Sequence, residues 1–350
     1  MRLILFFLLF SNIATAQIRS YVIHYTTRYP RASEADISAL DNGDIIVYYS
    51  RFYGGYHDDV GSDIYSVISH DGGKNWVNNA WTQPNIAKVN TMSVSTLNES
   101  GTTWLFFLVR NSSTDLRPWL KKTTNNGSTW TTPAPLFPDQ AYWTVNNNRI
   151  IRTSSGRLIC PAARVANGDS LGVTQKLTSS VWYSDNNGSS WTESNRLSLP
   201  QYSLGMQEPG VVELSAGNLL MYARVQAGGR QWFANSTDNG TTWGAPYQST
   251  LVSPMAPAKL IKLSDGRLLA AHCNNGNSNN HRRPMTLSVS ADNGATWTVK
   301  YNLTSDPIRS YAYPSLLEKN GEIYMTYWEQ QSALPVFSLV FARIPLTFLN

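Results

Sequence analysis

The chain has 350 residues, of which 42% are hydrophobic and 15% charged, and its formal net charge at neutral pH is +5. The basic residues are scattered, with only Lys121–Lys122 and Arg282–Arg283 adjacent, whereas a nucleic-acid-binding surface needs a denser basic stripe. This distribution argues against a nucleic-acid partner. It favours anionic substrates, which a mildly basic surface attracts.

The first 16 residues have the pattern of a secretory signal. Arg2 precedes an apolar run from Leu3 to Phe10, and Ala14-Thr15-Ala16 matches a small-residue cleavage site. The run is too short to span a bilayer, and no later stretch reaches the roughly 18 apolar residues that a spanning helix needs. We therefore expect a secreted or periplasmic protein without stable membrane insertion, in which residues 17–350 form a single domain.

The first repeated unit begins with a turn glycine, Gly43, which opens an apolar strand. A polar turn follows as Ser69-His-Asp71-Gly-Gly73-Lys-Asn-Trp76. An aspartate at this place hydrogen-bonds neighbouring backbone, a glycine tolerates positive φ, and a tryptophan packs beneath the loop. The unit therefore predicts β-strands joined by a tight turn.

The same turn, Ser/Thr-x-Asp/Asn-x-Gly-x-Ser/Thr/Asn-Trp, returns four more times, with successive tryptophans 54, 61, 52 and 54 positions apart. Strands opened by a glycine interleave with these turns, and no segment between them has a long helical period. A period of about 50 residues is typical of a propeller with one four-stranded sheet per repeat. The sequence predicts an all-β, six-bladed β-propeller whose last blade is closed by strands from both termini. The tryptophans are Trp76, Trp130, Trp191, Trp243 and Trp297, and the glycines are Gly43, Gly101, Gly156, Gly217, Gly266 and Gly321.

The two cysteines, Cys160 and Cys273, lie 113 positions apart in strand-like segments. An exported protein is able to form a disulfide, but spacing does not show whether these residues meet. We expect two buried thiols. Because the five histidines are dispersed and no Cys/His cluster has zinc-ligand spacing, we expect neither a metal nor a cofactor.

The repeated turn resembles the Asp-box of sialidases (neuraminidases) and related propellers, and the resemblance covers the whole mature chain. In that family the Asp-boxes lie on the outer rim, remote from the substrate pocket. The resemblance therefore implies a structural role for the motif aspartates and asparagines, and it indicates the fold more strongly than the function.

The family's chemistry implies roles for four residues. A sialic acid carries its own carboxylate at the anomeric carbon, which repels a carboxylate nucleophile, so a tyrosine attacks and a glutamate takes its proton. By resemblance, Tyr313 in Tyr311-Ala-Tyr313-Pro is the nucleophile and Glu208 its base, and the two side chains are expected within hydrogen-bond reach. Asp58, in a glycine-rich loop across the cavity, is the acid, with Asp59 as the alternative.

Sialidases hold the substrate carboxylate with a cluster of arginines, whose planar forks bind it bidentately. The resemblance implies Arg224, and Arg283 in slight preference to Arg282, as members that line the central axis. The Arg-Ile-Pro signature that supplies another arginine is absent, and its place falls near Glu34. The candidates to replace that arginine are Arg31, Arg51, Arg117 and Arg149.

The resemblance thus implies an exo-acting, retaining glycosidase that releases terminal sialic acid or a related ulosonic acid from acidic glycans. One alternative is a propeller lyase or another glycosidase acting on acidic glycans, for which His281 or His24 would serve as a base. The other alternative is a glycan-binding propeller without activity. A lyase forms a double bond that absorbs in the ultraviolet, and a hydrolase does not.

Overall fold

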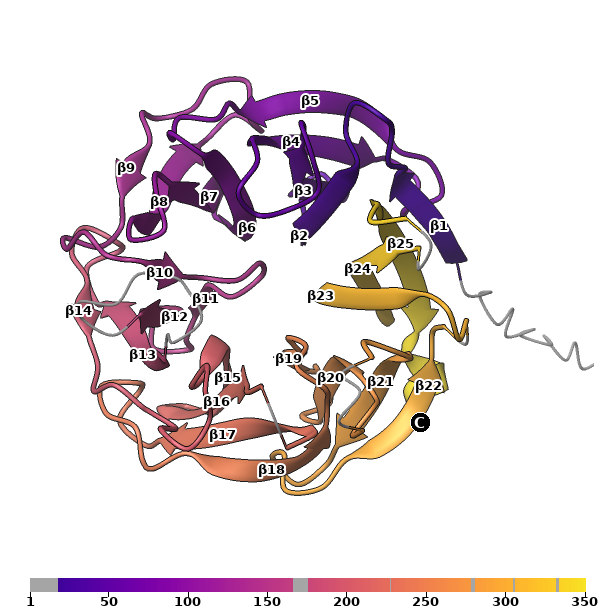
Figure 1. The fold of residues 1–350 in the computed structure, drawn as a ribbon. Helices are drawn as coiled ribbons and strands as arrows, with labels where there is room; N and C mark the ends of the chain where they lie inside the picture. The colour runs from indigo at the N-terminus through magenta and orange to yellow at the C-terminus, as the bar shows by residue number, and fades with distance from the viewer. Residues whose placement is uncertain (1–17, 166–175, 227, 278–280, 305, 332–333) are drawn as a thin grey trace, which may run out of the picture.

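The computed structural model describes residues 18–165, 176–226, 228–277, 281–304, 306–331 and 334–350, so the expected signal at residues 1–16 lies outside the described residues. Its strands form sheets arranged radially around one axis (Figure 1). The first three sheets consist of β2 (Arg31–Ala39), β3 (Ile45–Phe52), β4 (Ser62–Ser69) and β5 (Val77–Gln83); β6 (Asn90–Glu99), β7 (Thr102–Arg110), β8 (Leu116–Thr123) and β9 (Ala134–Pro135); and β10 (Trp143–Thr144), β11 (Ile151–Arg152), β12 (Leu158–Val165), β13 (Leu177–Ser184) and β14 (Thr192–Glu193).

The second half of the chain repeats this plan. Its sheets consist of β15 (Gln207–Ser215), β16 (Asn218–Arg224), β17 (Arg230–Ser236) and β18 (Tyr247–Val252); β19 (Lys259–Lys262), β20 (Leu268–Cys273), β21 (Met285–Ser290) and β22 (Thr298–Asn302); and β23 (Ser310–Lys319), β24 (Glu322–Gln330), β25 (Phe337–Pro345) and β1 (Ile18–Ile23). One short 3-10 helix, Leu346–Leu349, follows.

The ring is closed by the two ends of the chain, as the sequence predicted. β1 pairs antiparallel with β25, so the N-terminal strand is the outermost strand of the sixth blade (Figure 1). The first and sixth blades are also joined by one parallel residue pair, Arg31 with Phe337. Dividing the eight-stranded sheet at this single pair gives six blades, and the predicted all-β propeller is confirmed.

The Asp-box turns link neighbouring blades. In the first turn the Ser69 hydroxyl donates to Asp71 Oδ1 at 2.8 Å and accepts the Gly73 amide at 2.7 Å. Gly73 has φ +89°, and a Cβ there would lie 2.1 Å from a ring carbon of Phe341 in the sixth blade. Trp76 packs edge-on against the same ring. The turn therefore requires glycine at position 73, and the Asp71 carboxylate stabilises the turn by accepting hydrogen bonds within it.

The innermost strands carry β-bulges that face the axis. The ladders of β2, β6 and β23 each skip register once, and that of β15 skips twice, the first time at Glu208. In each bulge one non-glycine residue adopts a positive φ, namely Glu34 (44°), Ser93 (56°), Glu208 (49°) and Tyr313 (57°). Such a conformation is costly for these residues and is concentrated at functional sites. Here it directs four side chains from four blades toward one place.

The remaining expectations concern cysteines and membrane association. Cys160 and Cys273 are both buried free thiols. Within the described ranges, no helix has the length and apolar character that crossing a bilayer requires.

Candidate active site

A cavity at the propeller axis contains the polar groups that the sequence assigned to catalysis. Arg31, Glu34, Asp58, Glu208 and Tyr313 all line it, and they come from the first, fourth and sixth blades. The opposite wall is mostly apolar and belongs to the hydrophobic core of the second and third blades; it includes Met92, Leu108, Leu116, Tyr142 and Val145. The cavity is therefore charged on one side and apolar on the other, which suits a sugar with both kinds of substituent.

Tyr313 and Glu208 meet although they are 105 positions apart. The Tyr313 hydroxyl donates to Glu208 Oε1 at 3.1 Å. Glu208 Oε2 accepts from Arg224 Nε at 2.5 Å, so the carboxylate is held between a phenol and a guanidinium. Since a proton moves only between groups in hydrogen-bond contact, this geometry allows Glu208 to take the phenol proton.

The electrostatics of this pair favour a neutral phenol beside a charged carboxylate. Burial raises the pKa of Tyr313 well above its usual value, and the negative charge of Glu208 adds to this rise. Burial would also raise the pKa of Glu208, but Arg224, Arg282 and the Tyr313 hydrogen bond outweigh it and hold that pKa below its usual range. At neutral pH Glu208 is a carboxylate able to accept a proton, and Tyr313 needs such a base in order to react.

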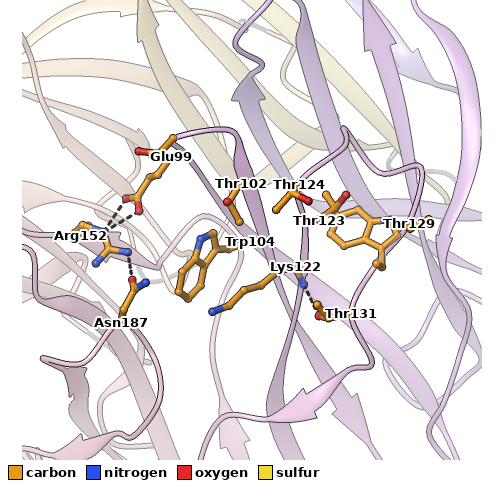
Figure 2. A pocket seen from close by; sticks show the side chains of 12 residues that line it. Glu99, Thr102, Trp104, Lys122, Thr123, Thr124, Thr129, Thr131, Arg152 and Asn187 are labelled. Carbon is orange, nitrogen blue, oxygen red and sulfur yellow. Dashed lines mark hydrogen bonds and ion pairs between the residues drawn. The ribbon is translucent and has the colours of Figure 1, made fainter.

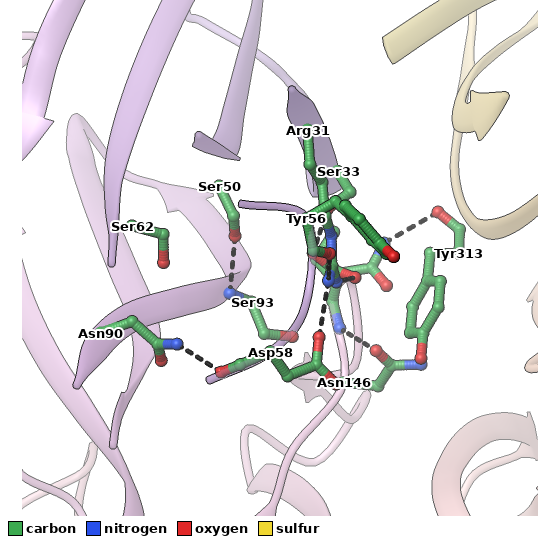
Figure 3. Close-up of polar contacts among 12 residues, drawn as sticks. Arg31, Ser33, Ser50, Tyr56, Asp58, Ser62, Asn90, Ser93, Asn146 and Tyr313 are labelled. Atoms are coloured by element: carbon green, nitrogen blue, oxygen red, sulfur yellow. Dashed lines mark hydrogen bonds and ion pairs between the residues drawn. The ribbon is translucent and has the colours of Figure 1, made fainter. Parts of the chain in front are cut away.

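Arg31 connects two carboxylates at the mouth of the cavity (Figure 3). Its Nη1 donates to Asp58 Oδ1 at 2.6 Å, and its Nη2 donates to Glu34 Oε1 at 2.5 Å. The Phe52 ring lies 4.1 Å from the guanidinium carbon and fixes its other face. Of the four candidates to replace the missing signature arginine, Arg31 is the one that lines the cavity, and two internal carboxylates already occupy its donors.

Asp58 lies in the loop between β3 and β4, as expected, and its backbone is fixed there. Its carbonyl accepts hydrogen bonds from Asn90 Nδ2 and from Arg110 Nη1, both at 2.6 Å. The walls around the loop withdraw the Asp58 carboxyl from water, which would raise its pKa, although 62% of the side chain remains exposed. Arg31, Arg110 and Arg224 act in the opposite direction, and the pKa lies below its usual value. Asp59, the alternative acid, is exposed and does not line the cavity.

Neither Arg282 nor Arg283 is among the residues that line the axial cavity. Arg283 lines a separate groove with His281 and Asp306. Arg282 lies 6.0 Å from the Trp328 ring, which packs against Tyr313, and its charge acts on both Tyr313 and Glu208. The two residues lie in a tight turn before β21, in which the Arg283 amide donates to the His281 carbonyl at 3.0 Å.

The other three candidates to replace the missing arginine do not line the cavity. Arg51 stacks on Tyr29, with its guanidinium carbon 3.9 Å from that ring's centroid. Arg117 pairs with Asp115 at 3.0 Å in the second blade. Arg149 is buried in the interior, where its Nη2 donates to the Ala258 carbonyl at 2.8 Å.

A buried polar network near the axis was not anticipated from the sequence. Asp36 accepts a hydrogen bond from Asn148 Nδ2 at 2.6 Å, and Lys259 Nζ donates to the Asn148 carbonyl at 2.5 Å. Asn147 Nδ2 donates to the Tyr313 carbonyl at 3.2 Å, so the network also holds the backbone of the proposed nucleophile. Burial raises the pKa of Asp36 to about 6 and lowers the pKa of Lys259 to about 7. The sequence signal that could have revealed this network is a charged residue inside an otherwise apolar strand, as at Asp36 in β2 and Lys259 in β19.

Neither histidine proposed for a lyase reaches the cavity. His24 stacks on Tyr21, with ring centroids 4.0 Å apart, and His281 lines the groove beside Arg283. Among the residues that the structure describes, no group of three or more His, Cys, Asp or Glu side chains is arranged to hold a metal ion.

Comparison with known proteins extends this description. A family model described as a BNR repeat-like domain matches residues 64–325. A sialidase of Bacteroides fragilis (strain YCH46) is 26% identical over 233 residues, which cover 63% of this chain and 41% of that protein. The chain therefore spans about two fifths of the length of this curated relative.

Solved structures with the same fold include Trypanosoma rangeli sialidase in complex with the inhibitor DANA, at TM-score 0.75 and 18% identity over 95% of this chain and 60% of that one. A Hadza microbial sialidase has TM-score 0.79 and 18% identity over 95% of this chain and 69% of that one. A protein of unknown function from Dyadobacter fermentans has TM-score 0.75 and 17% identity over 95% of this chain and 99% of that one. These similarities establish the propeller fold.

Proposed function

The chain belongs to the BNR repeat-like domain family, and on that basis we propose that it is an exo-acting, retaining glycosidase that releases a terminal sialic acid or a related ulosonic acid. The similarity to sialidases supports the substrate class. The contact of 3.1 Å between the Tyr313 hydroxyl and Glu208 is the observation that carries the proposal.

In the first step the Tyr313 oxygen attacks the anomeric carbon while Glu208 takes the phenol proton. The bond to the leaving oxygen breaks, and Asp58 gives that oxygen a proton, so the aglycone leaves as an alcohol. In the second step the Asp58 carboxylate takes a proton from water, which attacks the anomeric carbon. The bond to Tyr313 then breaks and Glu208 returns the proton to the phenol oxygen. Two displacements at one carbon retain its configuration.

The charge of the site explains why a tyrosine suits this reaction. Three guanidinium groups, those of Arg31, Arg224 and Arg282, act on a site that also holds three carboxylates, those of Glu34, Asp58 and Glu208. The positive charge is therefore already compensated before a substrate arrives. A neutral phenol approaches an anionic sugar without further repulsion, which a carboxylate nucleophile would not do.

Asp58 occupies a position that a substrate carboxylate would take. In the free protein its Oδ1 lies on Arg31 Nη1 at 2.6 Å, and the cavity holds only about 80 Å³, below the roughly 300 Å³ at which small-molecule pockets begin. A sugar carboxylate that displaces Asp58 from Arg31 would enlarge the cavity. It would also remove the main attraction that keeps Asp58 ionised, so its pKa would rise and it would become able to donate a proton.

A fluorogenic α-sialoside tests the proposal, with the Tyr313→Phe variant beside the wild type. We expect turnover by the wild type, initial release of the α-anomer by NMR, and loss of turnover in the variant. Tyr311→Phe is the matched control, because Tyr311 is a buried tyrosine on the same strand that does not line the cavity. An unsaturated sugar product, identified by its alkene signals in the NMR spectrum, would show a lyase. Binding of the sialoside without turnover would show a glycan-binding propeller.

A further inference from the structure

Two larger hollows lie between the second and third blades, away from the axial cavity. One holds about 670 Å³ and the other about 650 Å³, and both are lined by Lys122 and Thr131, so they form one continuous groove. We call it the interblade groove. It shares no lining residue with the axial cavity. Each half lies in the size range of small-molecule sites.

The ammonium group of Lys122 is a charge in the interblade groove that has no counterion among the described residues. Its ammonium lies 3.4 Å from the centroid of the Trp104 ring (Figure 2). Within the described part of the chain, no hydrogen bond or ion pair engages this ammonium. Lys121, the next residue back, instead donates to the Thr82 carbonyl, so the two adjacent lysines differ in their surroundings.

The other charges of the groove are paired. Arg152 Nε donates to both carboxylate oxygens of Glu99, at 3.0 and 2.8 Å, and its Nη2 donates to Asn187 at 2.8 Å (Figure 2). Arg117, in the other half, pairs with Asp115. Burial and the nearby Arg152 lower the pKa of Lys122, so its ammonium is less stable in the empty groove than it would be in water. An anion beside the ammonium would remove that penalty.

The walls have the character of a sugar-binding surface. Trp130 and Trp191 are half-buried and line the two halves, and they present apolar ring surface. Hydroxyl groups surround them and match the donors and acceptors of a sugar ring. These hydroxyl residues include Thr102, Thr129, Thr131 and Ser190.

We propose that the interblade groove is a second, non-catalytic site for an acidic oligosaccharide, with Lys122 binding a carboxylate or sulfate and the tryptophans contacting adjacent rings. The groove has room for more than one ring, whereas a free anion would need only the ammonium. The site does not depend on the proposed hydrolysis, because none of its residues touches Tyr313, Glu208 or Asp58.

Isothermal titration calorimetry on the Tyr313→Phe protein tests the site without substrate turnover. The probes are a galacturonate tetrasaccharide, a sulfated chondroitin tetrasaccharide, neutral maltotetraose and inorganic sulfate. We expect at least one acidic tetrasaccharide to bind at least tenfold more tightly than maltotetraose or sulfate. Lys122→Met, which keeps the length of the side chain over Trp104, should weaken that binding at least tenfold.

Lys74→Met is the matched control. Lys74 is an exposed lysine in the first Asp-box turn, so its replacement changes the net charge equally but leaves the groove intact. The Lys74→Met variant should bind the acidic tetrasaccharide with the same affinity as the Tyr313→Phe protein. Thermal unfolding should confirm that both lysine variants are folded. Equal affinity in Lys122→Met, equal binding of sulfate and tetrasaccharide, or no binding of either acidic probe would overturn the proposal.

Discussion

Replacing Glu208 with glutamine removes the proposed base while preserving the shape of the side chain. The amide oxygen is able to accept from Arg224 in place of Oε2, and the amide nitrogen then faces the Tyr313 oxygen and donates to it, so both contacts have a neutral counterpart. What the amide cannot do is take a proton. The variant therefore separates proton transfer from positioning.

The expected loss follows from the ionisation of Tyr313. A phenol with the usual pKa near 10 is ionised to about one part in a thousand at pH 7, and burial raises the pKa of Tyr313 beyond that. Loss of a general base commonly costs about 10²–10⁴ in rate. We expect kcat of Glu208→Gln to fall by about 10³–10⁴, which corresponds to about 4–5.5 kcal/mol of activation free energy.

The variant also leaves Arg224 without its counterion. Both side chains are largely buried, with 11% and 14% of their area exposed, and breaking a buried ion pair by removing one partner costs about 3–5 kcal/mol of stability. Unfolding of Glu208→Gln is therefore measured first, and kcat is taken at a temperature at which the variant is fully folded. Tyr313→Phe provides the comparison, because it preserves the Glu208–Arg224 pair.

Initial rates with a fluorogenic sialoside between pH 4 and 8 complete the test. Because the pKa of Glu208 lies below its usual range, the wild type should keep its activity down to about pH 4.5, and the residual activity of the variant should increase at high pH as the phenol ionises. If folded Glu208→Gln retains kcat within tenfold of the wild type while Tyr313→Phe is inactive, Glu208 is not the base.

Three further predictions concern the surrounding charges. Arg282→Ala should raise KM for an anionic sugar by about 10–100-fold, as expected for one charge-assisted hydrogen bond, while Arg283→Ala should change it less than about threefold in the same assay. Glu34→Gln should tighten an anionic inhibitor by about 1–3 kcal/mol in calorimetry, because a buried like charge is removed beside Arg31; weaker binding would show that Glu34 positions the arginine instead. Burial raises the pKa of Asp36 from 3.8 to about 6, so the folded state binds more protons than the unfolded state between these values. The free energy of unfolding in urea should therefore fall by about 3 kcal/mol as pH rises through that window, and Asp36→Asn should lack this slope.

The fold was predictable from the sequence because its signal is local. The hydrogen bonds of an Asp-box join residues at most four positions apart, as in the contact of Ser69 with Gly73, and the tryptophan that follows packs against the blade that precedes it around the ring. Five such turns at a near-constant spacing indicate the repeat, and the six strands opened by a glycine indicate the number of blades. Tyr313 and Glu208 were assigned through the resemblance to sialidases, on the short patterns that surround them at the entries of two inner strands.

The composition of the site was decided by the tertiary structure. Closing the ring brings together residues 105 positions apart, and no local pattern reports that proximity. A bulge with positive φ at Glu34 and Tyr313 determines which side chain turns to the axis, and a shift of one residue reverses the face. Arg282 and Arg283 lie in the connection between β20 and β21, outside any strand, so no alternation of side chains shows from the sequence which of them lies nearer the axis. Arg31 pairs with Asp58 and Glu34 within the first blade, where the bulge at Glu34 and the loop between β3 and β4 bring the three side chains together.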